Sequence, residues 1–137
     1  ANLKSSNLKN ANLESADLTK ANLKKVNLKR ADLTNAKFID ANLSQADFKG
    51  ATIQNTDFTN AKLINADFRN ADLRKADFSY ANLNYADLRG SFFKNANFEN
   101  SSIIGTKIDI YQGIRLLGCP DYYPIGWRCQ DNYLIRD

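Results

Sequence analysis

The sequence predicts an all-β solenoid, and three observations support this fold class. The first 110 residues divide into 22 consecutive five-residue units without interruption. The third residue of every unit is Leu, Phe or Ile, and the first is small or β-branched, mostly Ala. The residue between these two is usually Asn or Asp. Residues 1–110 are therefore expected to form one repeat domain.

A period of five residues is incompatible with a long helix or a flat strand. Five helical residues turn about 140° beyond one full circle, so successive Leu residues would spiral around all sides. In a strand, side chains alternate between faces, so an odd period would send every second Leu into water. The pattern works if the chain bends once per unit. The first and third residues then point inward, the second points outward, and the last two form a corner.

The aromatic residues favour four sides per coil. A repeat of 20 residues sorts the large core residues into columns, whereas a repeat of 15 would interleave Phe with Leu and Ile. Four sides correspond to about 5.5 coils stacked on one another. The expected columns are Leu3, Leu23, Leu43, Leu63 and Leu83; Phe38, Phe58, Phe78 and Phe98; and, opposite these rings, Phe48 and Phe68.

The units at 16–20 and 71–75 read ADLTK and ADLRK, and they resemble the pentapeptide repeat family, whose pattern is A(D/N)LXX. The resemblance covers residues 1–110 and implies a right-handed quadrilateral β-helix. Most members of this family have no known biochemical function. Some act on DNA gyrase by presenting an acidic, DNA-like rod.

The outward positions predict two surface features. Asp47, Asp67 and Asp87 form one column beside a column of Lys and Arg, which predicts a lattice of surface ion pairs. Tyr80, Tyr85 and Phe92 point outward near one end of the repeat. They are either a contact patch for a partner or scattered surface rings.

Three Gly residues, at 50, 90 and 105, occupy the last position of their units. A corner there can require positive φ, which Gly adopts without steric cost. No phosphate-binding Gly-rich motif is present.

Residues 111–137 depart from the repeat and are expected to cap the last coil. A short helical turn is predicted over about 107–117, ended by Gly118 and Pro120. Cys119 and Cys129 favour a disulfide within this cap, which would place the protein in an oxidising compartment such as a thylakoid lumen, a periplasm or the cell exterior. The alternative is a pair of free thiols in the cytoplasm.

The composition argues against catalysis. His is absent, so a Ser-His or Cys-His device cannot exist, and two Cys alone cannot complete a zinc site. We expect no catalytic residue, no cofactor and no metal. No run of 18 apolar residues exists, so the sequence predicts no membrane span.

The leading functional hypothesis is a non-catalytic scaffold that binds another protein through the outer walls of the rod. A DNA-mimicking topoisomerase modulator is the alternative, but the net charge is +4 and the Asp columns alternate with Lys and Arg. Residues 1–30 contain seven basic and two acidic residues, so this end of the rod is basic. Direct nucleic-acid binding through this end is a further, disfavoured hypothesis. The chain is expected to be a monomer or an end-to-end dimer through its first coil.

The prediction that the third residue of each unit points into the core is tested by the substitution Leu63→Asp. A carboxylate without a partner in the middle of the core should lower the free energy of unfolding by more than about 4 kcal/mol or abolish folding. Circular dichroism during thermal unfolding measures this, with Lys62→Asp at the neighbouring outward position as the control. Melting like that of the wild type would contradict an inward-facing Leu63.

Overall fold

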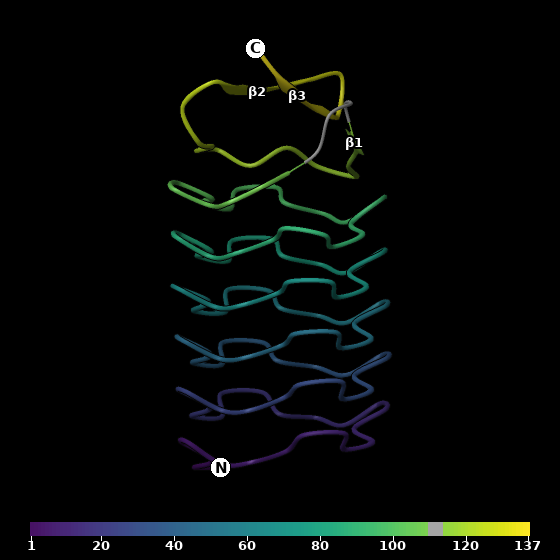
Figure 1. Ribbon diagram of the computed structural model, residues 1–137, viewed down its shortest axis with the longest axis vertical. Helices are drawn as coiled ribbons and strands as arrows, with labels where there is room; N and C mark the ends of the chain where they lie inside the picture. The colour runs from purple at the N-terminus through teal and green to yellow at the C-terminus, as the bar shows by residue number, and fades with distance from the viewer. Residues whose placement is uncertain (110–113) are drawn as a thin grey trace.

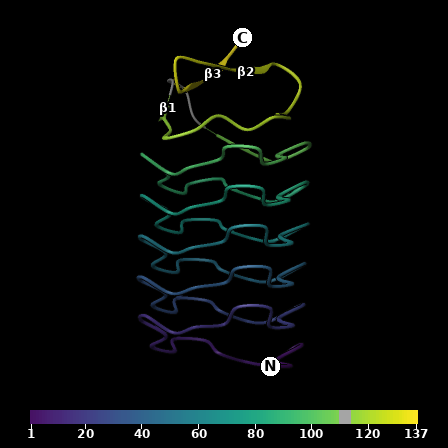
Figure 2. The ribbon, with the colours of Figure 1, turned by 180° about the vertical axis from the view of Figure 1, so that it is seen from behind.

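A computed structural model describes residues 1–109 and 114–137 of the chain. The repeat forms a rod of stacked coils, with the N-terminus at one end and a small sheet at the other (Figure 1; Figure 2 gives the view from behind). The second residue of each unit pairs in parallel with the residue 20 positions later, from Asn2 with Asn22 to Asp87 with Lys107. This interval corresponds to four units per coil and is incompatible with the three-sided alternative.

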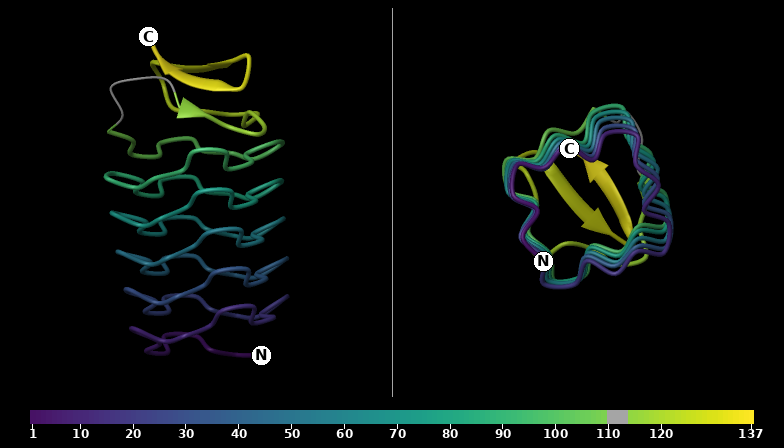
Figure 3. Two further views of the ribbon diagram at one scale, coloured as in Figure 1. Left: turned by 90° about the vertical axis from the view of Figure 1, so that its right-hand side faces the viewer. Right: turned by 90° about the horizontal axis from the view of Figure 1, so that it is seen from below.

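The coils are held together by backbone hydrogen bonds on every side. The amide N of Leu23 donates to the carbonyl O of Asn42 at 2.8 Å, and the N of Asn42 donates to the O of Ala21 at 3.0 Å. The end-on view in Figure 3 shows the resulting four-sided outline. We call the sides walls A, B, C and D. They begin with residues 1–5, 6–10, 11–15 and 16–20 respectively and continue every 20 residues, so walls A and C are opposite, as are B and D.

The corners depend on a left-handed residue. Every fifth residue from Ser5 to Gly105 has φ between 54° and 69°. Positive φ is therefore confirmed at Gly50, Gly90 and Gly105, but it is not restricted to Gly. Eight of these 21 positions are Asn, the non-Gly residue that tolerates this region best, and the others include Lys, Arg and Tyr. The turn is closed by the next unit, where Ala41 N donates to Phe38 O at 3.1 Å.

The Asn and Asp residues at the second position also shape the corner. Oδ1 of Asn42 accepts a hydrogen bond from the backbone N of Ser44 at 3.2 Å, and Oδ1 of Asp47 accepts one from Lys49 N at 3.1 Å. The side chain thus starts the turn that the fifth residue completes, which explains why short polar residues recur there.

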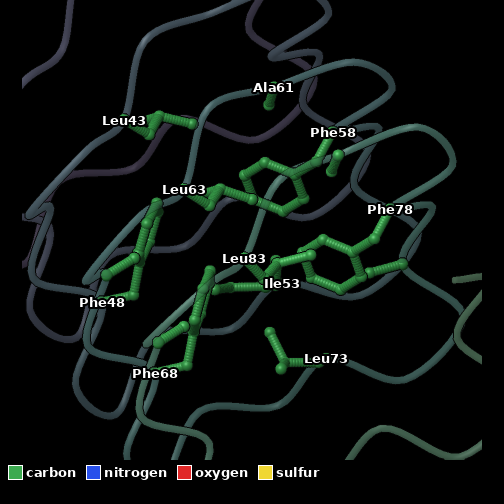
Figure 4. Close-up of a cluster of buried hydrophobic side chains, with 14 of the residues drawn as sticks. Leu43, Phe48, Ile53, Phe58, Ala61, Leu63, Phe68, Leu73, Phe78 and Leu83 are labelled. Carbon is green, nitrogen blue, oxygen red and sulfur yellow. The ribbon is translucent and has the colours of Figure 1, made fainter. Parts of the chain in front are cut away.

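The interior is filled by the third residues of the units. Phe38, Phe58, Phe78 and Phe98 stack along one column with ring centroids 5.0–5.1 Å apart. Phe48 and Phe68 stack in the opposite column at 4.6 Å, and the two columns meet edge to face across the core, as Figure 4 shows for four of the rings. Leu23, Leu43, Leu63 and Leu83 are fully buried. In the first coil Leu3 is only half-buried.

The C-terminal segment forms an antiparallel sheet of β1 (Ile114–Arg115), β2 (Trp127–Gln130) and β3 (Tyr133–Arg136), in the order β1-β3-β2. Leu116, Trp127 and Leu134 join the buried core of the rod. Asp131 and Asn132, both with positive φ, connect β2 to β3 as a two-residue hairpin turn.

The prediction of a helical turn over about 107–117 is wrong for residues 107–109 and 114–117, which the structure describes. Residues 110–113 lie outside the described residues. Ile114 and Arg115 form a strand instead, because their backbones pair with Leu134 and Tyr133 of β3. The described residues contain no helix.

Cys119 and Cys129 form a disulfide with their Cα atoms 5.8 Å apart. The bond joins the segment that follows β1 to the middle of β2, so it holds the small sheet closed. A loop of about 11 residues closed in this way contributes a little under about 3 kcal/mol in the chain-entropy model.

The left-handed corner is tested at Asn65, which has φ of 58° and lies between walls A and B. Asn65→Val should lower the free energy of unfolding by about 1–2 kcal/mol, because a β-branched side chain clashes in this region. Asn65→Gly, the matched control, should be nearly neutral. Urea unfolding measures both variants, and equal stability of the Val and Gly variants would contradict a left-handed requirement at this corner.

Candidate interaction surfaces

In residues 1–109 and 114–137, no group of three or more His, Cys, Asp or Glu is placed to hold a metal ion. Over the same residues, no helix has the length and apolarity needed to cross a membrane. The candidate sites are therefore the outer walls, which we describe in turn.

Wall B carries a continuous ladder of ion pairs, as the sequence predicted. Asp47 lies 3.3 Å from Lys29 Nζ and 3.4 Å from Lys49 Nζ. Farther along, Arg69 contacts Asp67 at 2.8 Å and Arg89 contacts Asp87 at 2.6 Å, while 3.8 Å contacts link successive coils. Each Asp of this column thus faces cations from its own coil and from a neighbouring one, which removes the repulsion between stacked carboxylates.

Hydrogen bonds from Arg lower the pKa of three Asp side chains, Asp67, Asp72 and Asp87. The Arg89 guanidinium lowers the pKa of Asp87, and this effect outweighs partial burial, which raises it. At Asp67 partial burial is the largest single effect and raises the pKa, but the hydrogen bonds from Arg69 and the charges of Arg69 and Lys49 together outweigh it, so the net shift is downward. On wall C, the guanidinium of Arg74 lowers the pKa of Asp72 in the same way.

The three outward aromatic residues are exposed, but they do not form one patch. Tyr80, Tyr85 and Phe92 are 61, 59 and 64% exposed. Tyr80 and Tyr85 occupy the two corners that border wall A. Phe92 pairs with Asp72 in the middle of wall C, on the opposite side of the rod. The three residues therefore lie on different sides of the rod, because the whole of wall B separates Tyr85 from Phe92 along the chain.

Each Tyr on wall A has a defined setting. Tyr80 lies at the edge of a shallow hollow of about 390 Å³ with Ile64, Lys62, Asn82 and the Asp40–Asn60 pair among its lining residues. Asn60 Nδ2 donates to Asp40 Oδ1 at 2.5 Å. The ring of Tyr85 lies against Gly105, where an added Cβ would come within 2.5 Å of the ring. Gly105 therefore leaves the space that this ring occupies.

Two further exposed apolar residues belong to wall A and were missed by sequence reasoning. Ile104 is exposed on the same wall, and Tyr122 of the C-terminal segment pairs in parallel with Ser102, which extends the wall beyond the repeat. The period of 20 could have found Ile104, since it lies two coils beyond Ile64. Nothing in the sequence pattern placed Tyr122, because it lies outside the repeat.

The N-terminal half of wall A, formed by units 1–5 and 21–25, is basic. Lys4 and Lys24 are in consecutive coils of this wall, and Lys20 and Lys25 lie at its corners. Asp40 is the one acidic side chain that borders the wall among the described units. Wall A thus differs from wall B in that its positive charge is not matched by carboxylates of its own.

The family is shown by a model of the pentapeptide repeat region, which matches residues 1–78 and 31–108. The chain belongs to the pentapeptide repeat family. A search among curated proteins finds no match.

Solved structures of pentapeptide repeat proteins resemble the chain. QnrB1, a plasmid-mediated fluoroquinolone resistance protein, is 24% identical with a TM-score of 0.60, and the match covers 78% of this chain and 57% of that one. HetL, involved in heterocyst differentiation regulation in the cyanobacterium Nostoc, is 25% identical over 89% of this chain and 63% of that one, with a TM-score of 0.45. Rfr23 from the cyanobacterium Cyanothece is 36% identical over 68% and 60%, with a TM-score of 0.37.

The likeness to QnrB1 shows the fold that the two share, the right-handed quadrilateral β-helix. The chain spans less than two thirds of the length of each of these three proteins.

The ion-pair ladder predicts a pH dependence of stability. Because the pKa of Asp87 is lowered from its ordinary value of 3.8, the folded state binds fewer protons than the unfolded state as the pH falls toward and below that value. The stabilisation is therefore complete above about pH 5 and is lost progressively in more acidic solution.

Arg89→Gln removes the main cause of this shift and should flatten the fall in the unfolding midpoint between about pH 5 and pH 2. Lys94→Gln on wall C, which removes a cation that forms no ion pair with the described residues, is the control. Thermal unfolding across this range measures the slope. An unchanged slope for Arg89→Gln would contradict the role assigned to this ion pair.

Proposed function

We propose that the protein is a non-catalytic scaffold that binds another protein through the outer walls of its rod. The observation that carries this proposal is that apolar side chains lie inside the rod and functional groups lie on its surface. Apolar side chains fill the interior of the repeat, and beyond the first coil the third residues of its units are almost all buried. The charged, amide and aromatic groups of the repeat lie on the walls and corners, where a macromolecular partner can reach them.

The walls suit this role because they are rigid before binding. Backbone hydrogen bonds join each coil to the next on all four sides, and nearly every corner has a turn hydrogen bond of its own. A partner that docks on such a surface orders few new torsions, so little of the binding free energy is lost to conformational entropy. Rigid surfaces of this kind also keep their shape between the free and bound states.

The DNA-mimic alternative has less support. Imitation of a polyanion requires a wall with an uncompensated negative potential. The Asp column of wall B is neutralised by Lys and Arg within 4 Å, and the chain as a whole carries a net charge of +4. We therefore do not adopt it.

The disulfide supports an oxidising compartment as the place of action, since such bonds persist there and are reduced in most cytosols. Whether the chain is a monomer or an end-to-end dimer stays a prediction.

The proposal is tested by photo-crosslinking from all four walls. A photoreactive residue replaces Ile64, Lys107, Lys94 or Ile39, one on each of walls A to D, and each variant is irradiated in an extract of the source organism. At least one position should form an adduct whose protein partner is identified by mass spectrometry. The absence of protein adducts from all four positions would contradict a protein-binding scaffold.

A further inference from the structure

We infer that wall A is the binding wall, and that its ligand is a polypeptide segment that is apolar at one end and acidic at the other. This inference rests on the proposed protein-binding function and names the surface and the chemistry of the partner. It is drawn from the distribution of apolar, charged and paired groups over the four walls.

Exposed apolar side chains concentrate on one half of wall A. Within residues 1–109, the exposed large hydrophobic residues are Tyr80, Tyr85, Phe92 and Ile104. Three of these four border wall A, and Tyr122 continues the wall toward the C-terminus. Phe92 is an isolated ring on wall C. Exposed Tyr residues together with aliphatic side chains on one wall are typical of the anchoring centre of a protein interface.

The hollow beside Tyr80 gives this half a place for an inserted side chain. The hollow has a volume of about 390 Å³, and Tyr80, Ile64 and the small Ala61 side chain are among its lining residues. The Asp40–Asn60 hydrogen bond occupies the polar edge of the hollow. An apolar side chain of the partner can therefore enter the hollow and contact Tyr80 and Ile64, while its backbone contacts the lining amides of Asn60 and Asn82.

The other half of wall A offers positive charge that the protein does not neutralise. Lys4, Lys20, Lys24 and Lys25 lie in or border units 1–5 and 21–25, which contain no acidic residue. Among the described residues, none of these Lys forms an ion pair, whereas the outward cations Lys29, Lys49, Arg69 and Arg89 of wall B each contact Asp. The contrast between two neighbouring walls of the same rod makes an acidic ligand the complement of this half of wall A.

The spacing of the two halves defines the ligand further. The level of Lys24 and that of Tyr85 differ by about three coils, or about 14 Å at 4.8 Å per coil. Two coils lie between them on this wall: unit 41–45, with the neutral side chains Asn42, Ser44 and Gln45, and unit 61–65, with Lys62 and Ile64. An extended polypeptide covers this distance in about four residues, at 3.3–3.6 Å per residue. The ligand should therefore carry its acidic and apolar groups about four residues apart.

This separation favours a polypeptide over a single-stranded nucleic acid. Proteins that bind single strands place aromatic rings for the bases alongside cations for the phosphates of the same nucleotides. On wall A these groups are segregated, and the aromatic half has Lys62 as its one cation among the described wall residues. A nucleic acid could not stack on Tyr80 and Tyr85 and contact the basic half with the same nucleotides.

The four-wall crosslinking experiment also tests this inference. Adducts should come from Ile64 on wall A and not from the positions on the other three walls. The crosslinked segment should contain apolar residues and, about four residues away, Asp or Glu. A protein partner captured mainly from another wall would overturn the inference and leave the proposed function standing, whereas the absence of protein adducts from every wall would overturn both. A segment without acidic residues, or a nucleic-acid adduct from wall A, would also overturn the inference.

Matched variants give a quantitative test with the captured segment as a synthetic peptide. Tyr80→Asn with Tyr85→Asn keeps a residue suited to positive φ at both corners, and it should weaken binding at least about tenfold through loss of the aromatic anchors. Phe92→Ser removes an equally exposed ring from wall C and should leave binding unchanged. Fluorescence titration measures the dissociation constants, and circular dichroism confirms that each variant is folded.

The basic half is tested separately by Lys4→Glu with Lys24→Glu. This variant should weaken binding about tenfold or more at low ionic strength, and the difference from the wild type should shrink as salt is added. The control is Lys75→Asn with Lys94→Glu. This variant removes one cation at a corner of wall C and one on the wall itself. Equal effects of the two charge variants, or no effect of either, would overturn the assignment of an acidic ligand to wall A.

Discussion

The structure depends on one backbone constraint, a left-handed residue at the end of every five. At this position the chain turns a corner, and the next inward-facing pair of residues begins in phase with the one before. The constraint carries a conformational cost that Lys, Arg and Tyr incur at several corners. The cost is offset because the corners allow backbone hydrogen bonds between successive coils and each brings another large side chain toward the core.

The corners also determine what the surface can do. Residues 20 apart in sequence become neighbours along the rod, so each wall is a set of short columns with its own chemistry. On wall B the columns alternate in charge, and the side chains contact one another. On wall A the columns change from Lys through neutral amides to Tyr and Ile, and little of this chemistry is used within the chain. The same scaffold thus supports a wall that stabilises itself and a wall that is open to a partner.

Much of the repeat could be predicted from the sequence, because the period of five is physically restrictive. The inward position of Leu63, the stacked rings of Phe38 and Phe58 and the pairing of Asp47 with Lys49 all follow from arithmetic on that period. The same arithmetic separates Tyr85 from Phe92, since the two occupy different walls, and it favours scattered surface rings over one patch of all three aromatic residues.

Other features depend on contacts that no period reveals. The left-handed corners at Lys and Tyr could have been suspected only from the frequency of Asn at the same position. The strand at Ile114–Arg115 exists because β3 pairs with it, and local preferences alone favoured a helical turn there. The Asp131–Asn132 pair was a usable signal for the hairpin, since these residues suit a two-residue turn with positive φ.

The closed square of the coil also limits how such a chain can change its length. Gain or loss of one unit rotates everything downstream by a quarter of the circumference, so Tyr80 and Tyr85 would no longer stand above the Lys residues of the first coils. Gain or loss of four units restores the alignment and changes only the height of the rod. Duplications in whole coils are therefore the length changes that preserve the pattern of wall A, and a single-unit change would send its two halves to different faces of the molecule.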